Sequence, residues 1–303
     1  MISEQTQVNG FILSSISLGF STFACLISCI IFLIIIYHLY YNHVKREEKI
    51  TVVLCSHIYL TIVIYSSMLI SMNVRSILGY LAILIFGMLY MNFLNQALYR
   101  LIRIVYSQNR WFLFLKLYII LPIIEIIIIT PILLSVLIPL NGVTYLPNDY
   151  FCYATFTNIP GVLCAAVVVY MCPLCCISFI YMHITKFIRQ QGNIQTLIIK
   201  QRQARDLLII RRILIIVSLL LILGIPALVL VFMFIITGEE YPLLTRISFF
   251  PVNVSQAGLS VALLFSIPQL KNIILNLRTT KTVAPVNQVV RGTIQMKKIA
   301  GTQ

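Results

Sequence analysis

Two rows of polar side chains interrupt long apolar stretches of this chain. The first row advances by four, three and four residues and consists of Asn92, Gln96, Tyr99 and Arg103. The second advances by three and four residues and consists of Asn253, Gln256 and Ser260. Such spacing places each row on one face of a helix. Inside a membrane, polar side chains of this kind either form hydrogen bonds that hold neighbouring helices together or take part in a switch. Both interpretations stay open.

A single carboxylate, Glu125, lies in the middle of another apolar stretch. An ionised group at that depth costs at least ~2.5 kcal/mol, so we expect the side chain to be neutral, or to face inward and donate a hydrogen bond to a polar residue on the second or third helix. A contact with a ligand is the alternative. The four histidines are scattered, and seven of the eight cysteines lie in apolar stretches. We therefore expect no metal site, no cofactor and no enzymatic activity.

The elements that must position these residues are seven apolar stretches, each long enough to cross a bilayer. They are residues 11–41, 50–72, 76–105, 111–140, 159–187, 207–236 and 243–267. Apolar residues make up 60% of the chain, charged residues 10%, and the mean hydropathy is +0.99. These values predict an all-α membrane protein with a bundle of seven transmembrane helices.

The basic residues predict the orientation of the bundle. If the first stretch enters from outside, 20 of the 22 Lys and Arg residues lie on the cytoplasmic side, and only Arg75 and Arg246 lie outside. This places the N-terminus outside and the C-terminus in the cytoplasm. Residues 1–10 then form a short extracellular segment, and residues 268–303 form a cytoplasmic tail with a short amphipathic helix at about 269–278. The net charge of +14 favours anionic lipid as a partner, not nucleic acid.

Prolines interrupt five of the stretches and predict kinks. They are Pro122 and Pro131, Pro173, Pro226, Pro251 and Pro268.

Around these residues the chain resembles a rhodopsin-like (class A) G-protein-coupled receptor over about residues 11 to 278. The end of the third stretch, Tyr99-Arg100-Leu101, is similar to the Asp-Arg-Tyr signature of that family and retains the arginine. Pro173 is followed eight residues later by Tyr181, as in the family's fifth helix. Asp206 precedes Pro226 by twenty residues, where the family often has the acid that pairs with the signature arginine.

The chain departs from the family at several of its usual switches. The Cys-Trp-x-Pro motif reads Leu223-Gly-Ile-Pro226, and the Asn-Pro-x-x-Tyr motif reads roughly Val261-Ala-Leu-Leu-Phe265. The second stretch has no acidic residue to hold sodium, and Glu125 stands about where the fourth helix has a tryptophan.

The resemblance implies a plasma-membrane receptor that activates a heterotrimeric G protein on its cytoplasmic side. The coupling and switch residues that it implies are Arg100, Tyr99, Asp206, Tyr181 and Arg103, with kinks at Pro173 and Pro226. Asp206 is expected to restrain Arg100, because Tyr99 replaces the neighbouring acid. The alternative is that Asp206 merely balances charge at a helix start.

The family joins the top of the third helix to the second outer loop by a disulfide. Cys152 is placed for the loop half, but Arg75 stands where its partner is expected. The resemblance therefore implies either a free thiol or another partner for Cys152.

The sequence also narrows the ligand. Ala82 stands where amine receptors of the family have an aspartate, and the seventh stretch has no lysine for a retinal Schiff base. A peptide or a small apolar molecule remains, in a pocket that includes Ala82, Phe86, Tyr170, Phe249 and Asn253. The other interpretation is that these rings face lipid or other helices.

Three classes of function compete for this chain. A receptor agrees with Arg100, Asp206 and Tyr181. A transporter or channel is the alternative and has only Glu125 to build on. A membrane enzyme needs a cluster of reactive side chains, which the sequence lacks.

Overall fold

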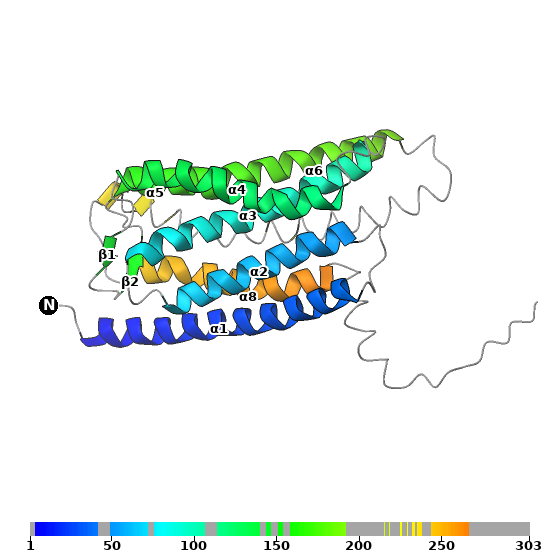
Figure 1. The fold of residues 1–303 in the computed structure, drawn as a ribbon. Coiled ribbons are helices and arrows are strands. Elements are labelled where there is room, and N and C mark those ends of the chain that lie inside the picture. Colours follow the sequence, from blue (N-terminus) through cyan, green and yellow to red (C-terminus); the bar gives the residue numbers. More distant parts are fainter. Residues whose placement is uncertain are drawn as a thin grey trace, which may run out of the picture.

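The computed structural model describes residues 4–41, 49–71, 76–106, 114–139, 144–146, 151–153, 158–191 and 244–266, with isolated positions between 215 and 237. This part of the chain is a helical bundle with one small hairpin (Figure 1). Its elements are α1 (Glu4–Tyr40), α2 (Lys49–Ser71), α3 (Ser76–Val105), α4 (Leu115–Leu137), β1 (Thr144–Leu146), β2 (Phe151–Tyr153), α5 (Ile159–Ala165), η2 (Ala166–Met171), α6 (Cys172–Gln191) and α8 (Leu244–Ser266). Most of the predicted sixth stretch lies outside the described residues.

Five helical segments are long and apolar enough to cross a membrane. They are Val8–Tyr40, Lys49–Ser71, Gly79–Val105, Leu115–Leu137 and Ile159–Gln190. A sixth apolar segment, Phe250–Phe265 in α8, is shorter. The prediction of a helical membrane protein is thus confirmed, and the five segments coincide with the first five predicted stretches. The count of seven and the orientation stay predictions.

The first helix begins earlier than the sequence pattern predicts. α1 starts at Glu4, so residues 4–10 belong to the helix and do not form a separate segment. Because these residues include no proline, nothing in the backbone stops the helix before the apolar stretch begins.

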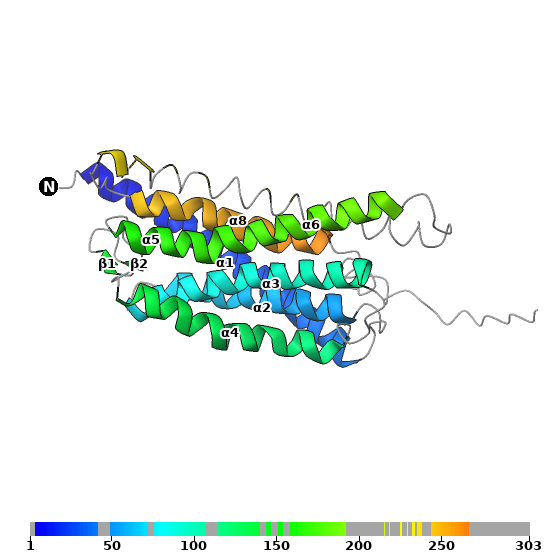
Figure 2. The ribbon, with the colours of Figure 1, turned by 90° about the horizontal axis from the view of Figure 1, so that it is seen from above.

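α3 lies at the centre of the bundle. It contacts α2, α4, η2, α6 and β2, whereas α1 packs on α2 and α8 (Figures 1 and 2). Among the five membrane-crossing segments, the most apolar part of α3 is the most buried and that of α4 the least. The central helix therefore carries the longer polar row, and the isoleucine-rich α4 faces lipid along most of its length.

The two ends of the bundle differ. The antiparallel hairpin of β1 and β2 lies at the end where α1 begins, and we call this the hairpin end (Figure 1). The opposite end, where α3 and α6 finish, carries Lys49, Arg100, Arg103, Lys116, Lys186 and Arg189, and we call it the basic end.

The predicted fifth stretch is built from three successive segments. Asn158 caps α5, because its side-chain oxygen accepts a hydrogen bond from the Gly161 N–H at 3.2 Å. The following π-helical turn, η2, ends just before Pro173, with the Cys172 N–H donating to the Val167 carbonyl five residues back. Pro173 has no N–H to donate and would crowd the carbonyl four residues earlier. The wider turn accommodates the proline without breaking the helix.

Gly87 in α3 lets η2 approach closely. A Cβ atom at this position would lie 3.2 Å from Cγ1 of Val169, which is tighter than an ordinary van der Waals contact. Small residues at helix contacts are a common device in membranes, where van der Waals packing replaces the hydrophobic effect between helices. Gly87 therefore fixes how near the η2 segment lies to the central helix.

Candidate functional site

The polar row of α3 is bound chiefly to α2. The Asn92 amide donates to the Thr61 hydroxyl at 2.9 Å, and the Gln96 amide donates to the Cys55 sulfur at 3.5 Å. Both amide side chains are buried, with 2% and 0% of their surface exposed. As the spacing predicts, these two residues of the row lie on one inward face of the helix. Its first role is to join the central helix to α2.

Asn95 joins α3 to α4 by a hydrogen bond to the carboxylate of Glu125. Its amide Nδ2 donates to Oε2 of Glu125 at 3.0 Å. Glu125 is half-buried, between Ile124 and Ile126, whose side chains are exposed. The partner lies on the third helix, as expected, but Glu125 accepts this hydrogen bond, whereas the sequence predicted that it donates one.

The polar row of α8 connects to α1 and α2. The Asn253 side chain is hydrogen-bonded to Ser17 and accepts a bond from the Ser21 hydroxyl at 3.4 Å. The Tyr59 hydroxyl donates to the backbone carbonyl of Ser260 at 3.1 Å. In the described part of the chain, the buried Gln256 amide has no hydrogen-bond partner.

Arg100 is buried near the basic end, with only 8% of its surface exposed. Cys55 of α2 and Tyr181 of α6 belong to the buried core cluster that Ala97 and Leu101, on either side of Arg100 in α3, also join. The Tyr181 hydroxyl is buried and finds no hydrogen-bond partner in the described residues. No ion pair joins Arg100 to any carboxylate of the described part. The structure thus brings two of the sequence-predicted switch residues, Arg100 and Tyr181, to one place.

Tyr99 lies elsewhere. Its ring is 3% exposed and meets the ring of Tyr118 edge-on, with centroids 5.1 Å apart and an interplanar angle of 79°. Ile50 and Leu54 of α2 complete this cluster. Tyr99 therefore anchors the end of α3 against α2 and α4. Arg103 is half-buried one turn beyond Arg100, whereas Asp206 and Pro226 lie outside the described residues.

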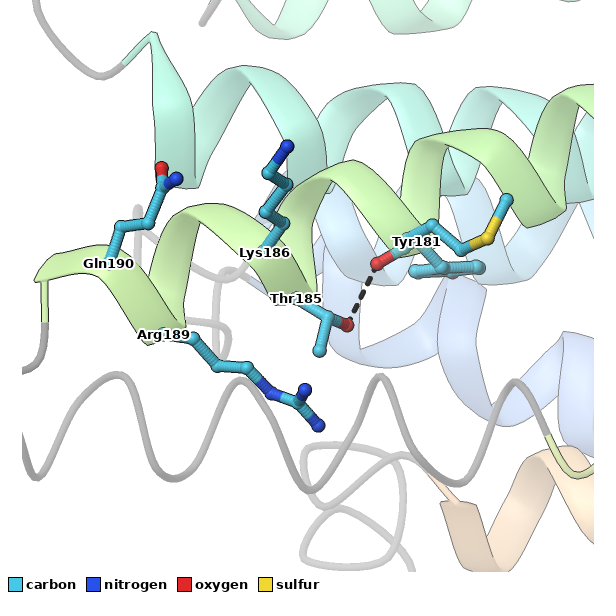
Figure 3. Close-up of a pocket in the computed structure, with 6 residues that line it drawn as sticks. Tyr181, Thr185, Lys186, Arg189 and Gln190 are labelled. Atoms are coloured by element: carbon cyan, nitrogen blue, oxygen red, sulfur yellow. Dashed lines mark hydrogen bonds between the residues drawn. The ribbon is translucent and has the colours of Figure 1, made fainter.

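A pocket of about 460 Å³ opens on α6 beside Tyr181 (Figure 3). Its described lining consists of Tyr181, Met182, Thr185, Lys186, Arg189 and Gln190. The pocket lies along the last turns of α6, toward the basic end.

The residues predicted to contact a ligand divide into two groups. Ala82 and Phe86 pack with Tyr65, and a chain of edge-on or tilted rings runs from Tyr65 through Phe86 and Tyr90 to Tyr170. Neighbouring ring centroids lie 5.0 to 5.5 Å apart, which is ordinary aromatic packing. Asn253 instead faces the serines of α1. The side chain of Phe249 lies outside the described part.

Several residues that contact the predicted site residues were not themselves predicted from the sequence. Ser17 and Ser21 are four residues apart on α1, and this spacing was a usable signal for a partner of Asn253. Tyr65 and Tyr118 gave no such signal, because a lone tyrosine in an apolar stretch does not reveal which ring it meets.

Seven cysteines of the described part are free thiols. Cys152 belongs to β2, where its backbone is in register with Tyr145, and its side chain lies outside the description. The state of Cys152 stays a prediction. Among the described residues, no group of three His, Cys, Asp or Glu side chains could hold a metal ion.

Comparison with known proteins adds no relative. No protein-family model matches the chain, and no curated protein sequence matches it either.

Proposed function

We propose that this chain is a rhodopsin-like G-protein-coupled receptor of the plasma membrane, with seven helices, the hairpin end outside and the basic end in the cytoplasm. It binds an extracellular peptide or small apolar ligand and activates a heterotrimeric G protein. The orientation is supported by the 20 of 22 basic residues that then lie on the cytoplasmic side.

The observation that carries this proposal is the buried arginine at the basic end. Arg100 is buried at the end of α3, next to the cluster that holds Cys55 of α2 and Tyr181 of α6, and no carboxylate of the described part pairs with it. A buried charge inside a membrane protein is costly and tends to mark a functional site. A shift of α6 away from α3 would expose Arg100 and give it a partner in the bound G protein. The two positions of α6 are the two states that a ligand could select between.

The polar rows along α3 and α8 serve as the framework of this receptor. They bind α3 to α2 and α4, and α8 to α1 and α2, through side chains that are already hydrogen-bonded. α6 packs on α3 through apolar side chains of the core cluster, Leu174, Ile177 and Ile184, and we propose it as the helix that moves, because apolar contacts have no fixed direction.

A test of the proposal measures G-protein activation without knowledge of the ligand. The full chain is expressed with a panel of Gα subunits, and basal nucleotide exchange is compared with that of cells expressing Arg100→Gln at equal surface amounts. We expect the unmodified chain to raise exchange on at least one Gα subunit and Arg100→Gln to abolish the increase. Identical exchange for the two proteins across the panel would contradict the proposal.

A further inference from the structure

α4 is the least buried of the five membrane-crossing segments and lies along one edge of the bundle (Figure 2). Its inner side packs on α2, α3 and α5, and its outer side is formed mainly by isoleucines. Isoleucines that face acyl chains need no protein partner, because lipid tails are as apolar as these side chains. The isoleucines alone therefore indicate no interaction surface.

One polar group interrupts this surface near the middle of the membrane. Glu125 is half-buried at the edge of the helix, between the buried Leu133 on the inner side and the exposed Ile128 and Ile132 on the outer side. Its Oε2 accepts the hydrogen bond from Asn95, and no second hydrogen bond reaches this carboxyl group within the described part of the chain. Because a carboxyl group at this depth is expected to be neutral, it carries a proton for which the described part offers no acceptor.

The surroundings of α4 in the membrane restrict what this acceptor is. Acyl chains have no hydrogen-bonding atoms, and headgroups and water begin about 15 Å from the middle of the bilayer. A second copy of the chain carries the same carboxyl group at the same depth. When two copies are related by a two-fold axis along the membrane normal, each Glu125 hydroxyl can donate to a carboxyl oxygen of the other copy, so the contact is self-complementary.

The residues in line with Glu125 have the spacing of a contact between two helices. Leu121, Glu125, Ile128, Ile132 and Ser135 advance by four, three, four and three residues, which is the heptad spacing of packed helices. Ile128 and Ile132 are 53% and 57% exposed, so their side chains are available to a partner. The exposed Ser135 donates its hydroxyl to the Ile132 carbonyl at 2.8 Å and presents only a small side chain, which lets another helix approach. We call these five residues the α4 seam.

We propose that the α4 seam is the interface of a homodimer in the membrane, in which two α4 helices pack in parallel and their Glu125 carboxyl groups form hydrogen bonds with each other. Asn95 is a positioning residue, because its hydrogen bond at 3.0 Å holds the carboxyl group at the edge of the helix. Hydrogen bonds between polar side chains hold helices together in membranes. The inference requires that α4 crosses the membrane, and it does not require coupling to a G protein.

The test measures energy transfer between full-length copies that carry donor and acceptor fluorescent proteins, over a dilution series in phosphatidylcholine liposomes. Each hydrogen bond between membrane helices is worth about threefold in affinity, so Glu125→Leu, which removes two of them, should dimerise roughly tenfold more weakly. The matched control Asn95→Leu removes the same bond within the chain but leaves the carboxyl pair, so it should dimerise within a few-fold of the unmodified chain. Equal loss in the two variants would overturn the proposal, as would an unmodified chain that stays monomeric at every dilution.

A second readout keeps Glu125 and Asn95 in place. Ile128→Cys adds a thiol on the seam, whereas Ile123→Cys adds one at an exposed position about 160° around the helix from Glu125. Under oxidation by copper phenanthroline in membranes, Ile128→Cys should form disulfide-linked dimers several-fold above the background of the unmodified chain, and Ile123→Cys should stay at that background. Equal cross-linking at the two positions would indicate random collision, and cross-linking to a protein of another mass would assign the seam to a different partner. Either result would overturn the proposal.

Discussion

At the residue scale, the hydrogen bond from Asn95 to Glu125 makes two roles of the Glu125 carboxylate testable, as a structural acceptor and as a carrier of a proton. Glu125→Gln keeps an oxygen that can accept the Asn95 N–H at the observed 3.0 Å, but it removes the titratable proton. We expect this variant to reach the surface and signal like the unmodified chain. Glu125→Leu leaves the Asn95 amide without its acceptor and should lower the free energy of unfolding by about 1–3 kcal/mol. Surface labelling and melting curves in detergent measure both effects.

If Glu125→Gln were delivered normally but abolished signalling or an ion flux, the proton itself would matter. The transporter or channel interpretation would then replace the receptor. A flux assay in proteoliposomes, run beside the signalling assay, reads this out directly.

Two buried tyrosines of α2 and α4 provide a matched pair. Tyr59 and Tyr118 are both almost fully buried, but only the Tyr59 hydroxyl is bonded, to the Ser260 carbonyl at 3.1 Å. The Tyr118 hydroxyl has no partner in the described part. Tyr59→Phe should therefore cost about 0.6 kcal/mol, a typical interhelical hydrogen bond in a membrane. Tyr118→Phe should be neutral or stabilising, because it removes an unsatisfied polar atom. A larger loss of melting temperature for Tyr118→Phe would show that its hydroxyl has a partner.

The restraint on Arg100 is the third prediction at this scale. No carboxylate of the described residues pairs with Arg100, so Asp206, which lies outside them, remains the acid that the family resemblance implies. Asp206→Asn should raise basal signalling severalfold, since coupling energies of roughly 1–3 kcal/mol shift populations by that much. Arg205→Gln serves as a control for a charge change beside Asp206. Unchanged basal output for Asp206→Asn at equal surface expression would support the simpler role in charge balance.

At the scale of the elements, the close approach of η2 to α3 makes a prediction of its own. In Gly87→Ala the new Cβ atom would lie only 3.2 Å from Cγ1 of Val169. This crowding should destabilise the protein by about 1 kcal/mol. Val169→Ala removes the atoms in conflict, and combining the two changes should restore part of the loss. The melting temperatures of both single variants and the double variant give the coupling energy. Strict additivity would show that the two positions do not meet.

The same elements show what the sequence predicts and what it does not. Apolar length predicts α2 and α3 nearly to the residue, because a membrane helix must satisfy its backbone internally over a fixed thickness. It predicts α4 as 111–140, whereas the helix spans Leu115–Leu137. The α3 row at Asn92 and Gln96 was also predictable, since helical spacing puts both on one face. The π turn before Pro173 was not, because the proline indicates a disturbance but not the form it takes.

For the candidate site, the sequence does not predict which side chains contact one another. Arg100 and Tyr181 were expected together only through the family resemblance, and Tyr181 belongs to the buried cluster that the α3 residues on either side of Arg100 join. Tyr99 was grouped with them, yet its ring meets Tyr118 of α4. Neighbouring residues on a helix point about 100° apart, so adjacency in sequence does not indicate a shared site. Asn253 likewise faces α1 and not the aromatic rings, since the partner of a polar residue depends on how helices are arranged.

At the scale of the whole molecule, the receptor proposal depends on orientation. It needs the basic end in the cytoplasm and the hairpin end outside. The energetic argument is the lopsided distribution of Lys and Arg, which biases insertion because cytoplasmic loops retain positive charge. Cys152 in β2 lies at the hairpin end and offers a reporter of that side of the membrane.

The last prediction uses this cysteine. An impermeant maleimide applied to intact cells should label Cys152 in the unmodified chain and not in Cys152→Ser, because the proposed orientation puts the hairpin outside and Arg75 stands where the family resemblance implies the disulfide partner. Cys152→Ser should reach the surface nearly unchanged, whereas the loss of a native disulfide typically costs 2–5 kcal/mol. Labelling that appears only after reduction would mean that Cys152 is bonded. Labelling that appears only after permeabilisation would place the hairpin in the cytoplasm, and the proposed receptor orientation would then be wrong.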